Sequence, residues 1–256
     1  MSIPFEQSRP LAALPGIRHG FFGRRGGSSA GVFASLNMSE SSGDMLTLVA
    51  NNRARAVDEL GFPPSSLATL RQVHSNSVIV LTAPPEDDPP PEGDALVTNV
   101  PGLVLGILTA DCAPILLADP AAGVIGAAHA GWKGAANGIT GATVLAMAGL
   151  GADPARIVAA IGPTISLRNY EVGPQFAMDL VAKHRDAVNR INRPSGGREH
   201  FDLPGFVVDQ LHGAGVGMVS DLGICTYADP ERYFSHRRAT HEGSTTGRQI
   251  ALIGLA

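Results

Sequence analysis

Three residues whose side chains commonly bind metal ions, His74, Cys112 and His129, are spread through the first half of the chain. Each follows or closes a short apolar run expected to form a strand, and residues at strand ends are held by rigid sheet while facing loops, where sites are built. Two imidazoles and one thiolate suit Zn²⁺, which accepts mixed nitrogen and sulfur ligands and, with three protein ligands, keeps a fourth position open. The three residues therefore predict a catalytic zinc site, which a single copper ion could also occupy.

Taken singly, these residues are more typical of structural roles, since a lone cysteine usually packs as a small hydrophobe and a lone histidine usually makes a structural hydrogen bond. Their neighbours favour a site instead. Asp111 places a carboxylate beside the Cys112 thiol at a break between two apolar runs, where buried polar groups need partners. Trp132 and Lys133 follow His129 in a glycine-rich turn that could bind an anion at the start of a helix. Glycines that merely permit the turn are the alternative.

The elements that must position these residues are expected to be short, because glycine and proline are plentiful, with 31 and 19 residues. Apolar runs rich in β-branched residues predict strands at 67–73, 77–82, 95–98, 103–109, 115–118 and 124–128. The proline-containing segment 119–123 predicts a turn, so the last two strands form a hairpin. The open ends of that hairpin would bring Cys112 and His129 close together.

Amphipathic patterns and proline positions predict helices at 51–60, 135–150, 174–188 and 204–213, and late apolar runs predict strands at 222–227 and 249–255. The acidic, proline-rich segment 84–93 is expected to be an exposed connector. Together these elements predict an α+β fold, with substantial sheet flanked by about four helices. The length of 256 residues and the 44% hydrophobic content support a single domain spanning residues 1–256.

The composition also narrows the class of partner. A net charge of -4 offers no broad basic face for nucleic acid or anionic lipid, so small-molecule partners are favoured. Neither a secretory leader nor a membrane-spanning apolar run is evident, so we expect a cytoplasmic protein that binds no membrane. Cys112 and Cys225 lie far apart in a chain of ordinary domain size, so no disulfide framework is expected. No oligomeric state follows from these features.

Short sequence blocks in a specific order extend along nearly the whole chain. They are HGFF at 19–22, RGG at 25–27, SLN at 35–37, NR at 52–53, QVH at 72–74, GDALVT at 93–98, TADC at 109–112, HAGWKG at 129–134, IGP at 161–163, CT at 225–226, FSHRR at 234–238 and TGRQ at 246–249. No block is decisive alone, but their joint order is. On these residues the chain resembles the laccase-domain proteins, a family described variously as multicopper polyphenol oxidases, purine nucleoside phosphorylases and peptidoglycan editing factors.

The resemblance implies a four-layer α/β/β/α arrangement, in which a two-layer β core lies between helices. It also implies a metal site with His74, Cys112 and His129 as ligands, the residues that their setting suggests independently. The activities that it implies are phosphorolysis of adenosine, inosine and methylthioadenosine, with adenosine deamination beside it. Lys133 stands where arginine is common and His236 where an aromatic residue is common, and these departures concern only the details of substrate and anion binding.

Each implied reaction needs its own groups. Deamination can use a metal-bound water as nucleophile, but the His-x-Glu and Pro-Cys-x-x-Cys signature of zinc deaminases is absent, so Asp111 is the predicted acid–base residue. Phosphorolysis needs an anion site and stabilisation of the negative charge on the departing base. Arg71 and Lys133, near the expected ligands in sequence, are predicted to bind phosphate, with Arg25 and Arg238 as further substrate-binding cations. For the late arginines, structural pairing is equally consistent.

Three alternatives use the same chain differently. Cys112 activated by His74 or His129 would be a catalytic nucleophile, as in an amidase that edits a peptidoglycan precursor, a reaction that a zinc-activated water could equally perform. A multicopper polyphenol oxidase would need roughly ten histidines, whereas the chain has eight in scattered positions. A non-enzymatic module that binds purines or metal is the third alternative. Of these readings, a zinc-dependent purine nucleoside enzyme is favoured.

Overall fold

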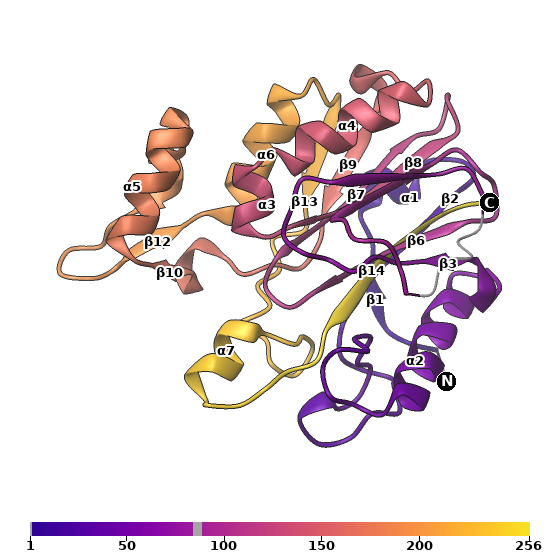
Figure 1. Cartoon of the computed structure of the whole chain (residues 1–256), viewed down its shortest axis with the longest axis horizontal. Coiled ribbons are helices and arrows are strands. Elements are labelled where there is room, and N and C mark those ends of the chain that lie inside the picture. Colours follow the sequence, from indigo (N-terminus) through magenta and orange to yellow (C-terminus); the bar gives the residue numbers. More distant parts are fainter. Residues whose placement is uncertain (1, 84–88) are drawn as a thin grey trace.

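The computed structural model of the chain describes residues 2–83 and 89–256 (Figure 1). Residues 84–88 of the predicted proline-rich connector lie outside the described residues. The remainder of that segment runs beside Arg71, which forms an isolated bridge with Glu92. None of the described helices is long and apolar enough to cross a membrane.

The secondary structure consists of short strands and helices, with the strands β3 to β8 following one another without a helix between them. The strands are β1 (Phe5–Glu6), β2 (Ile17–Phe22), β3 (Leu67–Ala68), β4 (Val78–Leu81), β5 (Ala95–Thr98), β6 (Val104–Thr109), β7 (Ala113–Asp119), β8 (Val124–Ala130), β9 (Val158–Ile161), β10 (Glu171–Val172), β11 (Ile191–Asn192), β12 (Glu199–Phe201), β13 (Met218–Asp221) and β14 (Gln249–Leu255). The α-helices are α1 (Arg9–Ala12), α2 (Leu46–Glu59), α3 (Trp132–Ala136), α4 (Ile139–Gly149), α5 (Pro174–Lys183), α6 (Leu203–Gly213) and α7 (His236–His241).

Two large sheets pack face to face at the centre of the molecule. Their strand orders are β1-β2-β14-β6-β3 and β13-β9-β7-β8-β5-β4. The facing sides share one apolar core, to which the five-stranded sheet contributes Leu105, Ile107 and Ile253 and the six-stranded sheet contributes Leu116 and Ile125. Because side chains alternate between the two faces of a strand, the outer face of each sheet needs its own cover.

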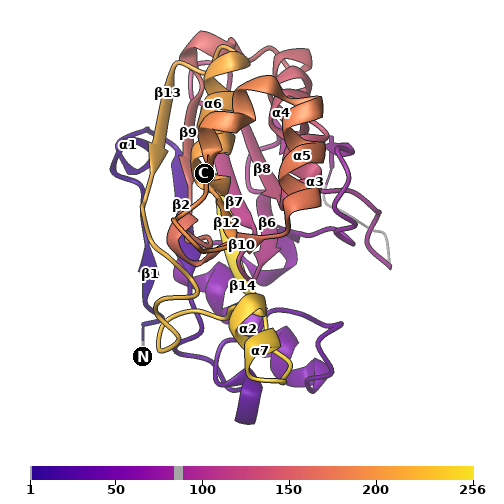
Figure 2. The same ribbon diagram turned by 90° about the vertical axis from the view of Figure 1, so that its left-hand side faces the viewer.

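Helices supply that cover on both outer faces (Figures 1 and 2). On the six-stranded sheet, α4 contacts β4, β5 and β8, while α6 contacts β7 and β13. On the five-stranded sheet, α2 buries Ala56 and Val57 in a core with Val104 and Leu252. The predicted α+β class and the four-layer α/β/β/α arrangement are therefore confirmed. A small third sheet, β10-β12-β11, projects to one side together with α5 (Figure 1).

The predicted hairpin is formed by β7 and β8. The two strands pair antiparallel from Asp119 opposite Val124, at the turn, to the open end, where Pro114 lies opposite His129. Cys112 comes two residues before Pro114, in the bend that precedes β7. The hairpin therefore brings Cys112 beside His129, as the sequence predicts.

The predicted helices differ from the observed ones at their ends. The helix expected at 51–60 starts earlier, as α2 at Leu46, and the one expected at 135–150 is divided into α3 and α4. Gly138 causes that division, because its φ of 85° is left-handed and cannot continue a helix. The helix expected at 174–188 ends as α5 at Lys183 and gives way to a 3₁₀ turn at 185–190. The short helices α1 and α7 were not expected, since one or two turns carry little periodic signal.

Two expected strands are also wrong. The strand predicted at 222–227 lies earlier, as β13, where it pairs in parallel with β9, and the residues after it are held by an isolated bridge between Thr164 and Cys225. The strand predicted at 67–73 is limited to β3, and the chain turns at His74 with a positive φ of 61°. His74 therefore lies on a loop rather than at the end of a strand.

Candidate metal centre

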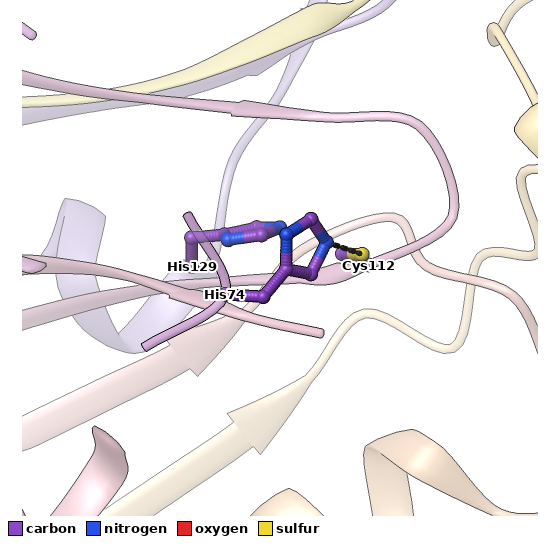
Figure 3. A group of neighbouring side chains, drawn as sticks. All are labelled: His74, Cys112 and His129. Carbon is purple, nitrogen blue, oxygen red and sulfur yellow. Dashed lines mark hydrogen bonds between the residues drawn. The ribbon is translucent and has the colours of Figure 1, made fainter. Parts of the chain in front are cut away.

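The side chains of His74, Cys112 and His129 converge on one point (Figure 3). Their potential ligand atoms all lie within 4.8 Å of one another. The Nε2 atom of His74 is 3.9 Å from the sulfur of Cys112, and the centroids of the two imidazole rings are 4.8 Å apart. The three side chains thus form a single cluster that could hold one metal ion.

The three residues come from different local settings. His129 is buried on β8, whereas Cys112 is half-buried in the bend before β7. His74 is exposed on the loop that precedes β4. Its positive φ is uncommon for a residue other than glycine, asparagine or aspartate, which indicates that surrounding contacts hold the loop in place.

A buried carboxylate behind the cluster, that of Asp94, provides those contacts. Its Oδ1 atom lies 2.8 Å from Nδ1 of His129. The same carboxylate accepts hydrogen bonds from the backbone N–H groups of residues 73–75, at 3.3, 3.0 and 2.6 Å, and from the Ser75 hydroxyl at 2.8 Å. Because Asp94 occupies Nδ1 of His129, Nε2 is the nitrogen left for the cluster. Asp94 therefore fixes the ring of His129 and the backbone that carries His74.

The charges of these groups support one another. Burial raises the pKa of the Cys112 thiol, but the charge and hydrogen bond of His129, together with His74, outweigh burial and lower that pKa from 9.0 to about 6. Burial lowers the pKa of His129, but the charge of Cys112 and the hydrogen bond to Asp94 raise it overall from 6.5 to about 9. Burial also raises the pKa of Asp94, yet its hydrogen bonds with His129 and Ser75 hold that pKa well below the usual range. The surroundings of Cys112 thus favour the thiolate, which is the form that binds metal.

A glycine packs closely against the cluster. A Cβ atom at Gly131 would lie 2.8 Å from Cδ2 of His74 and 3.0 Å from the sulfur of Cys112. The absence of a side chain there keeps the two ligand groups at their present separation.

The donor set fits a metal ion on three counts. It combines two imidazoles with a thiol whose surroundings favour the thiolate. A carboxylate orients one imidazole, as is usual for histidine ligands in metalloproteins. Within the described part of the chain, this is the one group of histidine, cysteine and carboxylate side chains with suitable spacing, which is enough for one ion.

Two cavities meet at the cluster. The first cavity, of about 510 Å³, is lined by all three cluster residues and by cations, namely Arg53, Arg71 and Arg248. The second cavity, of about 410 Å³, is lined by His74 and Cys112, by the aromatic side chains of Trp132 and Tyr170, and by the cations Lys133 and Arg237. His236 lines both. The cluster therefore faces a cationic space on one side and an aromatic space on the other.

Asp111 lies beside the cluster, and its carboxylate is engaged in hydrogen bonds within the protein. One oxygen accepts a hydrogen bond from the Thr226 hydroxyl at 2.6 Å, and the other accepts bonds from the Ser235 hydroxyl at 3.0 Å and the Arg237 backbone N–H at 2.7 Å. These contacts join the Cys112 bend to the start of α7. The acid–base role of Asp111 stays a prediction.

Two of the four predicted substrate-binding cations lie beside the cluster. Arg71 lines the first cavity, where it forms an ion pair with Glu92. Lys133 lines the second cavity, with its ammonium group 5.6 Å from the centre of the Trp132 ring. The structure thus separates the two residues predicted to bind phosphate and places them in different cavities, both of which His74 and Cys112 line.

The other two predicted cations contact backbone elsewhere. Arg25 donates a hydrogen bond to the carbonyl of Glu231 at 2.9 Å. Arg238 donates one to the carbonyl of Tyr227 at 2.6 Å and stacks on the ring of that tyrosine. Among the described residues that line the two cavities, neither arginine appears, so neither enters the function proposed below.

Three residues that sequence reasoning leaves without a role lie at the site. The sequence position of Asp94 could have indicated its role, because a carboxylate directly before a buried strand needs hydrogen-bond partners. No sequence feature indicated a role for Arg53 or Tyr170. Arg53 lies on α2 and Tyr170 on a loop, and only the fold brings them to the cavities.

Comparison with known proteins gives a consistent result. Residues 18–256 match the family model described as "Multi-copper polyphenol oxidoreductase laccase". The chain is 47% identical to a protein of Deinococcus radiodurans named purine nucleoside phosphorylase, over 96% of this chain and 93% of that protein. It is 41% identical to a protein of the same name from Corynebacterium glutamicum, over 93% and 94%.

Solved structures agree with these relatives. YlmD from Geobacillus stearothermophilus superposes with a TM-score of 0.86 at 33% identity and 98% coverage of both chains. NMB0706 from Neisseria meningitidis superposes with a TM-score of 0.85 at 30% identity, over 100% of this chain and 99% of that one. The chain therefore belongs to the multi-copper polyphenol oxidoreductase laccase family.

Proposed function

We propose that this chain is a zinc-dependent purine nucleoside phosphorylase whose active site is the His74, Cys112 and His129 cluster. The observation that carries the proposal is the position of the cluster between a cationic and an aromatic cavity. A nucleoside phosphorylase must hold an oxyanion and a flat base next to each other, and these two surroundings suit those two groups. The names of the Deinococcus and Corynebacterium relatives support the same reaction. The proposed substrates are adenosine, inosine and methylthioadenosine.

In phosphorolysis an oxygen of monohydrogen phosphate attacks C1′ of the ribose while the bond from C1′ to the base breaks. The base leaves with the bonding electrons and takes up the proton that the phosphate loses, so the products are the free base and ribose 1-phosphate. A zinc ion bound by the three ligands would supply a Lewis acid that stabilises negative charge on the departing base.

The chain's own residues have separate tasks in this scheme. Asp94 holds the His129 ring and the loop that bears His74, so the ligands are in place before substrate binds. Trp132 and Tyr170 offer ring faces for the base. Either Arg71 or Lys133 would bind phosphate, and their separation by the cluster makes the two assignments testable against each other.

Adenosine deamination is the second reaction of the proposal, with Asp111 as its acid–base residue. The carboxylate of Asp111 already accepts three hydrogen bonds, two on one oxygen and one on the other, which leaves a single lone-pair position for a proton. In Asp111→Asn, inosine formation would stop while adenine release continued. If both products fell equally, Asp111 would instead hold α7 in place.

The deciding experiment combines metal analysis with product analysis. Protein purified without added metal is assayed for zinc and copper by mass spectrometry and then incubated with adenosine, with and without phosphate. We expect about one zinc per chain and adenine release only with phosphate. Cys112→Ala should lose the metal and at least about a hundredfold of the rate, while Cys225→Ala serves as the matched control. Phosphate-independent adenine release, or no release at all, would contradict the proposal.

A second candidate function uses the same thiol as a nucleophile, in an amidase. The observation that favours it is the lowering of the Cys112 pKa to about 6 beside two histidines. Alkylation separates the two functions, because a nucleophilic Cys112 would react with iodoacetamide in metal-free protein and stay reactive after zinc is added. A zinc ligand would be protected by the added metal.

A further inference from the structure

The lining of the first cavity contains more cations than carboxylates. It contains three guanidinium groups and one carboxylate, that of Glu40. Two of the guanidinium groups are already paired, Arg53 with Glu40 and Arg71 with Glu92. Arg248 has no carboxylate partner in the described part of the chain, where it donates hydrogen bonds only to backbone carbonyls, at 3.1 and 3.4 Å. Arg248 is thus the guanidinium with donors left for a ligand.

Arg248 is held close to the metal cluster. It directly precedes β14, and its half-buried side chain lines the first cavity. Burial lowers the pKa of Arg248, while the negative charges of Cys112 and Asp111 raise it. Arg248 lines the same cavity as the three cluster residues, so an anion bound to Arg248 there would lie beside the cluster.

A second observation points to a ligand at the same place. The hydroxyl of Thr109 is buried and has no hydrogen-bond partner within residues 2–83 and 89–256. Thr109 lines the first cavity and pairs with Gln249, the residue after Arg248, across β6 and β14. Because buried hydroxyl groups nearly always have a partner, this unpaired hydroxyl in a residue of the cavity wall is consistent with a ligand that the protein itself does not supply.

The second cavity offers less to an oxyanion. Its ammonium group, that of Lys133, lies against the Trp132 ring, and Arg237 lies over the ring of Tyr170, 5.3 Å from its centre. Both cations therefore sit on aromatic faces, a setting that suits a flat base better than a phosphate group. His129 lines the first cavity and is absent from the described lining of the second.

We infer that the first cavity is the phosphate subsite, with Arg248 as its central cation and the Thr109 hydroxyl as a further donor. The ligand is a tetrahedral phosphate dianion, either free or as the phosphate of the ribose 1-phosphate product. This assignment rests on the proposed phosphorylase function and goes beyond it, because it decides against Lys133 as the phosphate-binding cation and names Arg248 in the first cavity instead. Arg53 and Arg71, each paired with a carboxylate, frame the entrance.

The test measures binding of inorganic phosphate to the zinc-loaded protein by calorimetry, without nucleoside. Arg248→Gln should weaken phosphate binding at least about tenfold, because it removes charge-assisted hydrogen bonds. The phosphate affinity of Arg248→Lys should lie between those of the wild type and Arg248→Gln. Arg25→Gln makes the same charge change at an exposed position outside the cavity and should bind phosphate like the wild type. Lys133→Gln should also leave it unchanged. Unaltered binding in Arg248→Gln, or a loss confined to Lys133→Gln, would overturn the assignment.

Thr109→Val should affect stability and phosphate binding differently. Removing an unpaired buried hydroxyl should leave the phosphate-free protein as stable as before or more stable in urea, while phosphate binding weakens a few-fold. Loss of stability with unchanged phosphate binding would argue that Thr109 has a purely structural role and count against the subsite.

Failure of the subsite and failure of the phosphorylase function give different results. Phosphate binding that depends on Arg248, with no base released from adenosine, would support the subsite and reject the phosphorylase. Phosphate-dependent release of adenine that Arg248→Gln leaves intact would reject the subsite and support the phosphorylase.

Discussion

The two histidines of the cluster come from regions of opposite character. His129 is buried on a central strand, and its ring contacts the fully buried carboxylate of Asp94. His74 is exposed on a loop with a positive φ, and the hydrogen bond recorded for its ring is the one to Cys112. The two residues offer the same kind of ligand atom but should differ in how much they contribute to the stability of the fold. Replacing either residue should therefore impair metal binding, whereas only replacement of His129 should lower the stability markedly.

The largest expected effect is that of His129→Ala compared with His74→Ala. Removing the His129 ring leaves a cavity and deprives a buried carboxylate of its partner, so the free energy of unfolding should fall by about 2–4 kcal/mol. Removing the exposed His74 ring should change it by less than about 0.5 kcal/mol. Urea unfolding in the presence of a chelator measures both without a contribution from metal.

Both variants should lose high-affinity zinc binding in a competition titration. Equal losses of stability would break the comparison, because the His74 loop would then be as much a part of the folded core as β8. Zinc binding retained by His74→Ala would show that His74 is not a ligand.

Asp94→Asn tests whether one carboxylate serves both regions. An amide in place of the carboxylate points its N–H groups toward the N–H groups of residues 73–75 or toward the His129 ring, so the orientation of both ligands suffers. Zinc affinity should fall by roughly 10–100-fold, as expected when the partner of a histidine ligand is lost. The measurement is competition with a chelator of known affinity.

Asp119→Asn is the matched control for Asp94→Asn. Asp119 is also fully buried, and it accepts a backbone N–H from Asp153 at 2.9 Å and pairs with Arg156. Its replacement should lower stability and leave zinc affinity unchanged. If both variants lowered zinc affinity alike, general loosening of the fold would explain the effect of Asp94→Asn.

A third histidine, His19, is buried like His129 but has no carboxylate partner, so it shows what His129 would lack without Asp94. Its Nε2 atom accepts the backbone N–H of Ser8 at 2.9 Å, and its Nδ1 atom has no partner within the described ranges. Burial lowers the pKa of His19 from 6.5 to about 4. The unfolded chain therefore takes up a proton first as the pH falls below 6.5, and stability is lost between pH 6.5 and 4.

The expected size of the His19 effect is about 1–2 kcal/mol between pH 7 and pH 5. The measurement is the free energy of unfolding of wild type and His19→Gln at both pH values. Subtracting one protein from the other removes the titration of the cluster, which is common to both. Parallel pH dependence in the two proteins would mean that His19 is protonated as easily in the folded state as in the unfolded state.

The sequence predicted those parts of the site that lie on regular strands. Cys112 and His129 flank an apolar hairpin with a clear turn signal, and pairing of its strands brings them together without any other information. Apolar runs also predicted several strands of the two sheets, whereas the two-layer core was implied by the family resemblance. The local sequence pattern was sufficient to predict these strands, because the apolar residues that define each strand lie within the strand itself.

Parts of the site built by distant contacts could not be predicted. Asp94 binds residues 73–75 through their backbone, and backbone groups carry no sequence signal. The division of the cations between two cavities depends on α2, α3 and β14 meeting at the cluster. The helix break at Gly138 was also missed, because glycine is tolerated inside helices and its φ is decided by packing.

The smallest expected effect is that of Gly131→Ala, which adds a methyl group next to the side chains of His74 and Cys112. The new Cβ would lie 2.8 Å from the His74 ring and 3.0 Å from the Cys112 sulfur. The exposed ring of His74 can turn away, whereas the bend at Cys112 is fixed by the hydrogen bonds of Asp111. His74 should therefore shift by a few tenths of an ångström, with zinc affinity lowered about 3–10-fold and stability changed by less than about 0.5 kcal/mol.

Gly141→Ala is the control for Gly131→Ala, because a Cβ there meets nothing within 4 Å and lies inside α4. It should raise stability by about 0.5–1 kcal/mol, as alanine does in a helix, and leave zinc affinity unchanged. A loss of zinc affinity in Gly131→Ala as large as that in Asp94→Asn would mean that the ring cannot turn away. His74 would then be held as rigidly as His129 despite its exposure, and the difference between the two histidines would lie in burial alone.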